Sequence, residues 1–328
     1  MKPLTHVFSI AAASLLLLAT GCGSNNSPAP GPSFTVYVVQ DGGGTAGNSV
    51  LEFPANGSGS ITPSNTVTVP SQTTCYSVAV DTSGNLYVSA SMGTAPSVVY
   101  EILVYVSGAT GSATPTRTIT SSSFSTTISS IAVDSTGEVY ALSGNSISVF
   151  AANAAANASP VRLITGNLTQ LNSVSSIAVD AAQNIYVANT AAGNILVFSS
   201  TETGNATPAG ILAGTLTDLG SPSGVATDSS GDLYVSTFNQ PSNSSLILEF
   251  FPGATGNVAP ARMLTAVASD AVAGLAVDAL DNLYVATSAS GQLAVDVFSS
   301  AESGNNAPAG TISSTAWTTP VYGQIAVR

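Results

Sequence analysis

Six copies of one pattern run along the chain, and their spacing limits the fold more than any other feature of the sequence. Each copy has a tyrosine inside a short apolar run such as NLYVS or NIYVA, an aromatic residue 10 to 18 positions later, and a proline after a further ten. The tyrosines are Tyr37, Tyr87, Tyr140, Tyr186, Tyr234 and Tyr284. The later aromatic residues are Phe53, Tyr105, Phe150, Phe198, Phe250 and Phe298, and the prolines are Pro63, Pro115, Pro160, Pro208, Pro260 and Pro308. Apolar runs rich in Val, Ile and Tyr predict β-strands.

The repeat length indicates a ring of small sheets. Successive tyrosines are 46 to 53 residues apart, and each repeat holds four short apolar segments. Four strands at this period are typical of a β-propeller blade. We therefore predict an all-β chain that folds as a six-bladed β-propeller of four-stranded blades, with strands a to d running from the axis to the rim.

The two ends of the pattern predict how the ring closes. The first copy begins at a strand b, residues 34–39, and the last copy ends at a strand a, residues 323–328. We expect these two strands to pair antiparallel, which completes one blade and removes a free sheet edge. The last strand ends in Arg328 where the other copies have aspartate, because no turn follows it.

The aspartates that end the other five inner strands are predicted to form turns. Each lies six residues before the tyrosine of its blade, a distance that fits one tight a–b hairpin in which the carboxylate accepts hydrogen bonds from its own turn. These aspartates are Asp81, Asp134, Asp180, Asp228 and Asp278. The b–c and d–a loops, on the opposite face, vary in length, so we look for function there.

Two further positions recur and are predicted to be structural. A small residue lies two positions before the end of each inner strand, where wedge-shaped blades leave room only for a methyl group. These residues are Ala79, Ala132, Ala178, Ala226, Ala276 and Ala326. Arg117, Arg162 and Arg262 share a position on the outermost strand, and we interpret them as solvated rim charges that discourage edge pairing.

The N-terminal residues predict export and a lipid anchor. Residues 1–21 resemble a signal peptide, with Lys2 before an apolar stretch of thirteen residues, 7–19. The sequence Ala-Thr-Gly-Cys that follows resembles a bacterial lipoprotein cleavage box, so we expect Cys22 to be acylated, residues 22–33 to form a Pro- and Ser-rich tether, and residues 34–328 to form the propeller. The expected location is the bacterial outer membrane, facing the periplasm or the cell surface. The alternative is a soluble secreted or periplasmic protein, in which Cys22 is free to pair with Cys75, the one other cysteine.

Composition excludes several classes of function. The chain carries a formal net charge of −12, and its basic residues after the signal segment are four arginines, so binding to nucleic acid phosphates is excluded. The one histidine, His6, lies in the predicted signal segment, which excludes His-based metal sites and Ser/His/Asp triads from the mature protein. We predict no catalytic residue.

Carboxylates on the variable face offer one alternative. Asp41 falls in a b–c loop, and Asp218 and Asp270 fall in d–a loops, with Asn189 and Asn239 as neighbours. Oxygen ligands of this kind suit Ca²⁺, and a metal site there is the alternative to a protein without cofactors.

The repeated strings of this chain resemble those of a known family. The string IAVDxxGNLYVA followed by ILVF is similar to the NHL-repeat family of six-bladed propellers, over nearly all of residues 34–328, although the Asn-His-Leu triplet that names the family is absent. Related propellers include gluconolactonase-like hydrolases, which hold a metal with acids and Asn, and streptogramin lyase-like enzymes, which use a His that this chain lacks. The resemblance implies the fold and not an activity. We expect a monomeric, non-enzymatic binding or scaffold propeller that recognises a protein, peptide or glycan on its b–c/d–a face. We expect it to contact the membrane only through its lipid anchor. The alternative is a metal-dependent lactonase-like hydrolase.

Overall fold

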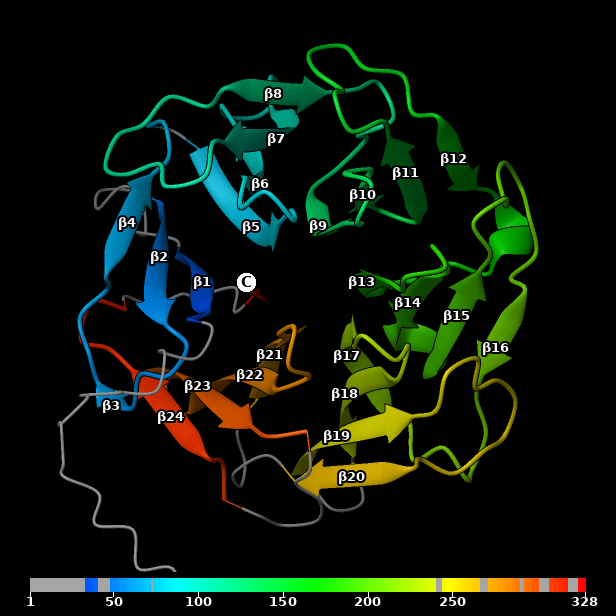
Figure 1. The fold of residues 1–328 in the computed structure, drawn as a ribbon. Helices are drawn as coiled ribbons and strands as arrows, with labels where there is room; N and C mark the ends of the chain where they lie inside the picture. The colour runs from blue at the N-terminus through cyan, green and yellow to red at the C-terminus, as the bar shows by residue number, and fades with distance from the viewer. Residues whose placement is uncertain are drawn as a thin grey trace, which may run out of the picture. The chain divides into compact units, whose positions relative to one another are not determined.

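Six sheets form a ring in the computed structural model of the chain (Figure 1). Each has four strands of one blade, and a short strand of the neighbouring blade adds a fifth to one of them. The structure describes residues 33–40, 48–71, 73–239, 244–265, 271–289, 292–300, 307–317 and 324–328. The predicted signal segment and nearly all of the tether lie outside the described residues. The predicted six-bladed β-propeller is confirmed.

Each blade contributes one strand to each of four positions, and we number the blades 1 to 6 from the one that contains β1. The inner a strands are β25 (Ile325–Val327), β5 (Thr73–Val80), β9 (Ile128–Val133), β13 (Val174–Val179), β17 (Ser221–Thr227) and β21 (Ala271–Val277). The b strands are β1 (Thr35–Gln40), β6 (Leu86–Met92), β10 (Val139–Ser143), β14 (Ile185–Asn189), β18 (Leu233–Asn239) and β22 (Leu283–Ala289). The c strands are β2 (Ser49–Pro54), β7 (Val99–Tyr105), β11 (Ser146–Phe150), β15 (Asn194–Phe198), β19 (Ser244–Phe250) and β23 (Gln292–Phe298). The outer d strands are β4 (Asn65–Thr68), β8 (Arg117–Thr120), β12 (Arg162–Thr165), β16 (Gly210–Leu212), β20 (Arg262–Thr265) and β24 (Gly310–Ser313).

Short segments complete the described chain. A two-residue strand, β3 (Gly59–Ser60), and two 3₁₀ turns, η1 (Asn167–Thr169) and η2 (Thr190–Ala192), lie in loops. Among the described residues there is no helix with the length and hydropathy needed to cross a lipid bilayer.

The hydrophobic core is divided into six clusters, and each cluster is shared by two neighbouring blades. The repeated residues face opposite ways because side chains alternate along a strand. Tyr87 and Ala79 pack toward blade 3, whereas Tyr105 of the same blade packs toward blade 1. A blade therefore has no core of its own, and each one needs both of its neighbours.

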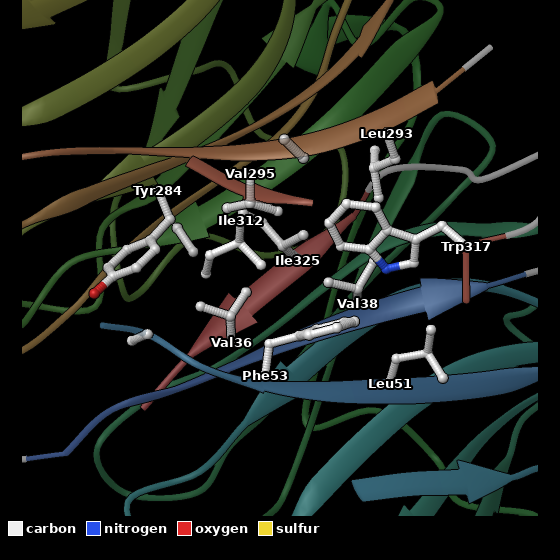
Figure 2. Close-up of a cluster of buried hydrophobic side chains, with 13 residues drawn as sticks. Val36, Val38, Leu51, Phe53, Tyr284, Leu293, Val295, Ile312, Trp317 and Ile325 are labelled. Carbon is white, nitrogen blue, oxygen red and sulfur yellow. The ribbon is translucent and has the colours of Figure 1, made fainter. Parts of the chain in front are cut away.

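The cluster between blades 6 and 1 contains the one tryptophan of the chain (Figure 2). Trp317 lies against Phe53, with 5.2 Å between the ring centroids and an edge-to-face angle of 64°. Trp317 lies in the d–a loop that follows β24, and it is only 8% exposed. Its loop folds back over the interface because an indole ring gains more from burial between two blades than from contact with water.

The two ends of the described chain close the ring as predicted. β25 pairs antiparallel with β1, with Val36 opposite Val327 and Val38 opposite Ile325. The backbone amide of Thr35 donates to the carbonyl of Arg328 at 2.6 Å, and the amide of Arg328 donates back at 3.1 Å. Blade 1 is thus built from both ends of the propeller chain.

Contacts between blades continue at the rim, where a c–d loop reaches the outer strand of the preceding blade. The carbonyl of Gly111 accepts from the amide of Thr68 at 2.7 Å, and its amide donates to Thr66 at 2.7 Å. The equivalent residues Gly59, Gly204 and Gly256 make parallel pairings of the same kind. All four have positive φ, from 57° to 76°, which is why glycine recurs four residues before the proline. The sequence pattern gave no indication of these pairings.

A second set of contacts between blades lies near the axis. The hydroxyls of Ser77, Ser130 and Ser176 are buried, and each accepts a backbone N–H from the inner strand of the following blade at 3.2 Å. Each of these serines follows a β-bulge or register shift in its blade or lies beside one. The inner strands are thus connected by hydrogen bonds that cross from sheet to sheet.

Removal of residues 323–328 should strongly destabilise the propeller. The deletion takes away the inner strand of blade 1 and exposes the clusters on both sides of it, so we expect the melting temperature to fall by roughly 10 °C or more. Thermal unfolding followed by circular dichroism measures the change. A deleted protein that melts at the wild-type temperature would contradict closure by these strands.

Candidate functional site

The five aspartates of the a–b turns bind their own turns. In Asp180, Oδ1 accepts from the amides of Ala182 and Asn184, both at 2.9 Å. Its Oδ2 accepts from the side-chain amide of Asn184 at 2.8 Å and from the hydroxyl of Tyr186 at 3.1 Å. Asp81, Asp134, Asp228 and Asp278 each accept two turn amides and the tyrosine hydroxyl in the same way. With their lone pairs used in this way, the ring of aspartates is poorly suited to holding a metal.

This geometry explains the constant spacing of six residues. Only at that distance does the tyrosine on strand b reach back to the carboxylate at the end of strand a. Burial raises the pKa of Tyr186, and the charge of Asp180 raises it further, so the phenol stays protonated and donates.

The arginines of the outer strands continue this network, and our interpretation of them as solvated rim charges is wrong. Arg162 Nη2 donates to the hydroxyl of Tyr140 at 3.2 Å, and its guanidinium carbon lies 5.6 Å from the ring centroid. The side chain of Arg162 is only 15% exposed. Arg117 and Arg262 make the same two contacts with Tyr87 and Tyr234. A guanidinium stacked on an aromatic ring is stabilised there, which draws it inward from the rim.

Hydrogen bonds lower the pKa of two of the turn aspartates. Burial alone would raise the pKa of Asp81, but hydrogen bonds from Asn85, Ser83 and Tyr87 outweigh burial and hold it below its ordinary value. The pKa of Asp134 is lowered in the same manner. Such groups stabilise the fold above their ordinary pKa, and that stability is lost as the pH falls through the folded-state pKa.

On the variable face, one of the three predicted metal ligands, Asp218, lies within the described residues. Asp218 is exposed, with a φ of 55°, at the end of a d–a turn where the neighbouring blade has Gln170. Asp41 and Asp270 lie outside the described residues, so the trio remains a prediction. Within the described ranges, no group of three His, Cys, Asp or Glu side chains is placed to hold a metal ion.

The two asparagines named with that trio differ in their surroundings. Asn189 is completely buried, and its side-chain oxygen accepts from the amide of Asn172 at 2.8 Å. Its side-chain nitrogen donates to Gln170 and Asn194. Asn189 is therefore committed to shaping its loop, whereas Asn239 ends β18 and is partly exposed.

Hydroxyl groups lie near the axis on the described part of this face. Thr190 donates to the carbonyl of Pro222 at 2.7 Å and lies 2.9 Å from the hydroxyl of Ser175. In the next blade the half-buried Ser223 of β17 lies with its hydroxyl 3.0 Å from that of Ser236 in β18, which is completely buried. Such groups form hydrogen bonds without adding charge, which suits a neutral polar partner.

Blade 2 holds buried polar residues that our sequence reasoning did not single out. Glu101 is 6% exposed, and burial raises the pKa of its carboxyl. Tyr105 is fully buried, and its hydroxyl has no hydrogen-bond partner among the described residues. Cys75 is buried in the same cluster. Burial raises the pKa of the Tyr105 phenol, and the neighbouring Cys75 and Glu101 raise it further. Both Tyr105 and Glu101 depart from the repeat, and this departure could have identified them. Five repeats have Phe where blade 2 has Tyr105, and no other repeat has an acid where blade 2 has Glu101.

Replacing the buried acid should stabilise the protein near neutral pH. Because the folded-state pKa of Glu101 is raised above 4.5, its ordinary value, the ionised form costs stability at higher pH and the protonated form does not. We expect Glu101→Gln to melt above the wild type at pH 8, by roughly 2–4 °C for each kcal/mol recovered, and the difference to vanish below about pH 4. The exposed Asp218→Asn is the control and should change neither value. A Glu101→Gln protein that is less stable at pH 8 would show that the carboxylate has a favourable partner.

Comparisons with known proteins support the fold and leave the activity open. No protein-family model matches the chain, and no curated protein sequence matches it. Among solved structures, a protein of unknown function from Bacteroides caccae is 12% identical, with a TM-score of 0.57 over 90% of this chain and 99% of that one. The periplasmic gluconolactonase of Pseudomonas aeruginosa is 13% identical, with a TM-score of 0.56 over 83% of this chain and 81% of that one. At this level of identity the likeness is one of fold alone, the β-propeller.

Proposed function

We propose that this propeller, NHL-like in its repeat, is a non-enzymatic binding or scaffold module that recognises a protein, peptide or glycan through its b–c/d–a face. One observation carries the proposal: the carboxylates that recur in the sequence are engaged in a–b turns on the opposite face. Besides the exposed Asp218, the described part of the variable face has hydroxyl and amide side chains, as at Thr190, Ser223 and Asn239. These groups favour a neutral polar partner over a charged one.

We also propose that Cys22 is acylated and that residues 22–33 tether the propeller to the outer membrane, as a monomer that faces the periplasm or the cell surface. The sequence around Cys22 supports this proposal. Mass spectrometry of the native N-terminus tests it, because a mature chain without acyl groups would favour the soluble alternative, in which Cys22 is free to pair with Cys75.

The purified domain should have no lactonase activity. Lactone hydrolysis by a metal needs a cation held by several ligands and a base beside the bound water. We expect no turnover of a panel of lactones and esters in the presence of Ca²⁺, Mg²⁺, Zn²⁺ or Mn²⁺. Turnover that depends on a metal and disappears in Asp41→Ala, Asp218→Ala or Asp270→Ala would favour the hydrolase alternative and overturn our proposal.

Binding itself is tested with a charge placed on the proposed face. Phe238 is partly exposed at the variable-face end of β18, and Ser83 is exposed on an a–b turn of the other face. On arrays of neutral glycans and peptides, Phe238→Glu should lose the signals of the wild type, and Ser83→Glu should keep them. Equal loss in both variants, or an array without signals, would contradict recognition by this face.

A further inference from the structure

The d–a loops share a solvent-accessible position whose backbone N–H is available to donate a hydrogen bond. It belongs to the residue six positions after the first residue of the outer strand, and it is described in five blades. These residues are Ser71, Ser123, Leu168, Leu216 and Ala316.

In four of the five blades the protein supplies the acceptor. Leu168 donates to the side-chain oxygen of Asn205 at 2.8 Å, and Leu216 donates to that of Asn257 at 2.7 Å. Both asparagines come from the following blade, directly after the glycine that pairs with the outer strand. Ser123 donates to the hydroxyl of Ser121 at 3.3 Å, and Ala316 donates to that of Ser314 at 3.2 Å.

Blade 1 is the exception among these five. Val69 stands where Ser121 and Ser314 stand in their blades, and an isopropyl group cannot accept. Ser112 stands where blades 4 and 5 have Asn205 and Asn257, which reach back to the preceding blades, and its side chain is too short to do so. Within the described residues, no protein group accepts a hydrogen bond from the amide of Ser71.

A groove lies at this point, between the outer strand of blade 1 and the c–d loop of blade 2. Its volume is about 430 Å³, which falls in the range of small-ligand sites. It is lined by Thr68, Val69, Pro70, Ser71 and residues 112–115. The lining combines apolar surface from valine, alanine and two prolines with hydroxyl groups, and it contains no charged side chain.

The other blades indicate what this groove would bind. In blades 3 and 4 the equivalent amide donates to a carboxamide oxygen, that of Asn205 or Asn257. We propose that the groove between blades 1 and 2 binds the acetamido group of a neutral N-acetylated amino sugar, whose carbonyl accepts from the amide of Ser71. The apolar lining suits the acetyl methyl group, and the hydroxyls of Ser112 and Thr114 suit those of the sugar.

A second groove serves as an internal comparison. It lies between blades 6 and 1, has a volume of about 260 Å³, and is lined in part by Ser60, Ser313 and Ser314. Here the loop amide, that of Ala316, already donates to Ser314. We therefore expect this groove not to bind the acetamido group. Ser71 belongs to a d–a loop, so this proposal rests on the glycan recognition proposed for the b–c/d–a face and narrows it to one groove. Phe238 does not line the groove, so the array test with Phe238→Glu and the titration below can fail separately.

Titration of the propeller with N-acetylglucosamine, followed by ¹H–¹⁵N NMR, tests the proposal. The amides of Ser71 and Ala113 should shift in a saturable way, with glucose as the sugar that lacks the acetamide and should leave them unmoved. Ser71→Pro removes the donor and should weaken binding about tenfold or more, whereas Ser71→Ala keeps the backbone amide and should bind as the wild type does. Ser112→Trp fills the groove and should abolish binding even if Ser71→Pro fails to fold.

One variant tests for a gain of binding. Asn205→Ser frees the amide of Leu168, so that amide should begin to respond to N-acetylglucosamine. The proposal is overturned if the Ser71 amide does not shift, if glucose shifts it equally, or if Ser112→Trp binds normally. It is also overturned if an acetylated, amidated dipeptide binds more tightly than the sugar, because the site would then be a peptide site.

Discussion

Packing between neighbouring blades is the interaction on which the rest of this structure depends. Each of the six hydrophobic clusters is made by two blades, so a blade outside the ring would expose two apolar faces. The pairing of β25 with β1 supplies the last of these interfaces with its inner strand. Serine hydroxyls near the axis and glycine pairings at the rim then connect the sheets by hydrogen bonds, so the sheets are joined at both their inner and outer edges.

Much of this could be predicted from the sequence because the repeat is regular. The tyrosines, aromatic residues and prolines indicated six blades, and the first and last strands indicated closure, since both depend on the order of residues along the chain. The pairings of Gly111 with the preceding blade, in contrast, join residues about 44 positions apart and have no local pattern of their own. The constant distance of ten residues between aromatic residue and proline reflects this crossing loop, but spacing alone does not tell which strand the loop reaches.

Individual side chains were less predictable than strands. Arg162 packs on the ring of Tyr140, and Trp317 packs against Phe53. The repeat pattern does not predict either contact, so it does not predict that these side chains face inward. The aspartates show the opposite case, in which turn, tyrosine and carboxylate lie within six residues of one another. The candidate metal site was the hardest part to predict, because the repeat does not relate its three acids to one another. Asp218 lies exposed on a turn, and the other two acids lie outside the described residues.

Departures from the repeat are concentrated where blades 1 and 2 meet. Cys75, Glu101 and Tyr105 are buried in blade 2, and Val69 of blade 1, which packs in the same cluster as Cys75 and Tyr105, lines the groove at the rim. In a repeat protein, the consensus residues serve the fold, and residues that differ in one copy are free to serve something else. The interface between blades 1 and 2 is therefore the one of the six where we expect a function beyond folding.

Native-state hydrogen exchange tests the dependence of the ring on its closure most directly. If the blades support one another, the amides of Thr35 and Val39, which donate from β1 to β25, should exchange with the same free energy of opening as that of Ile177 in β13, in the opposite blade. That free energy should equal the global free energy of unfolding. Exchange of β1 and β25 at a much lower free energy, with the other inner strands still protected, would show that five blades remain folded without closure and would contradict this account.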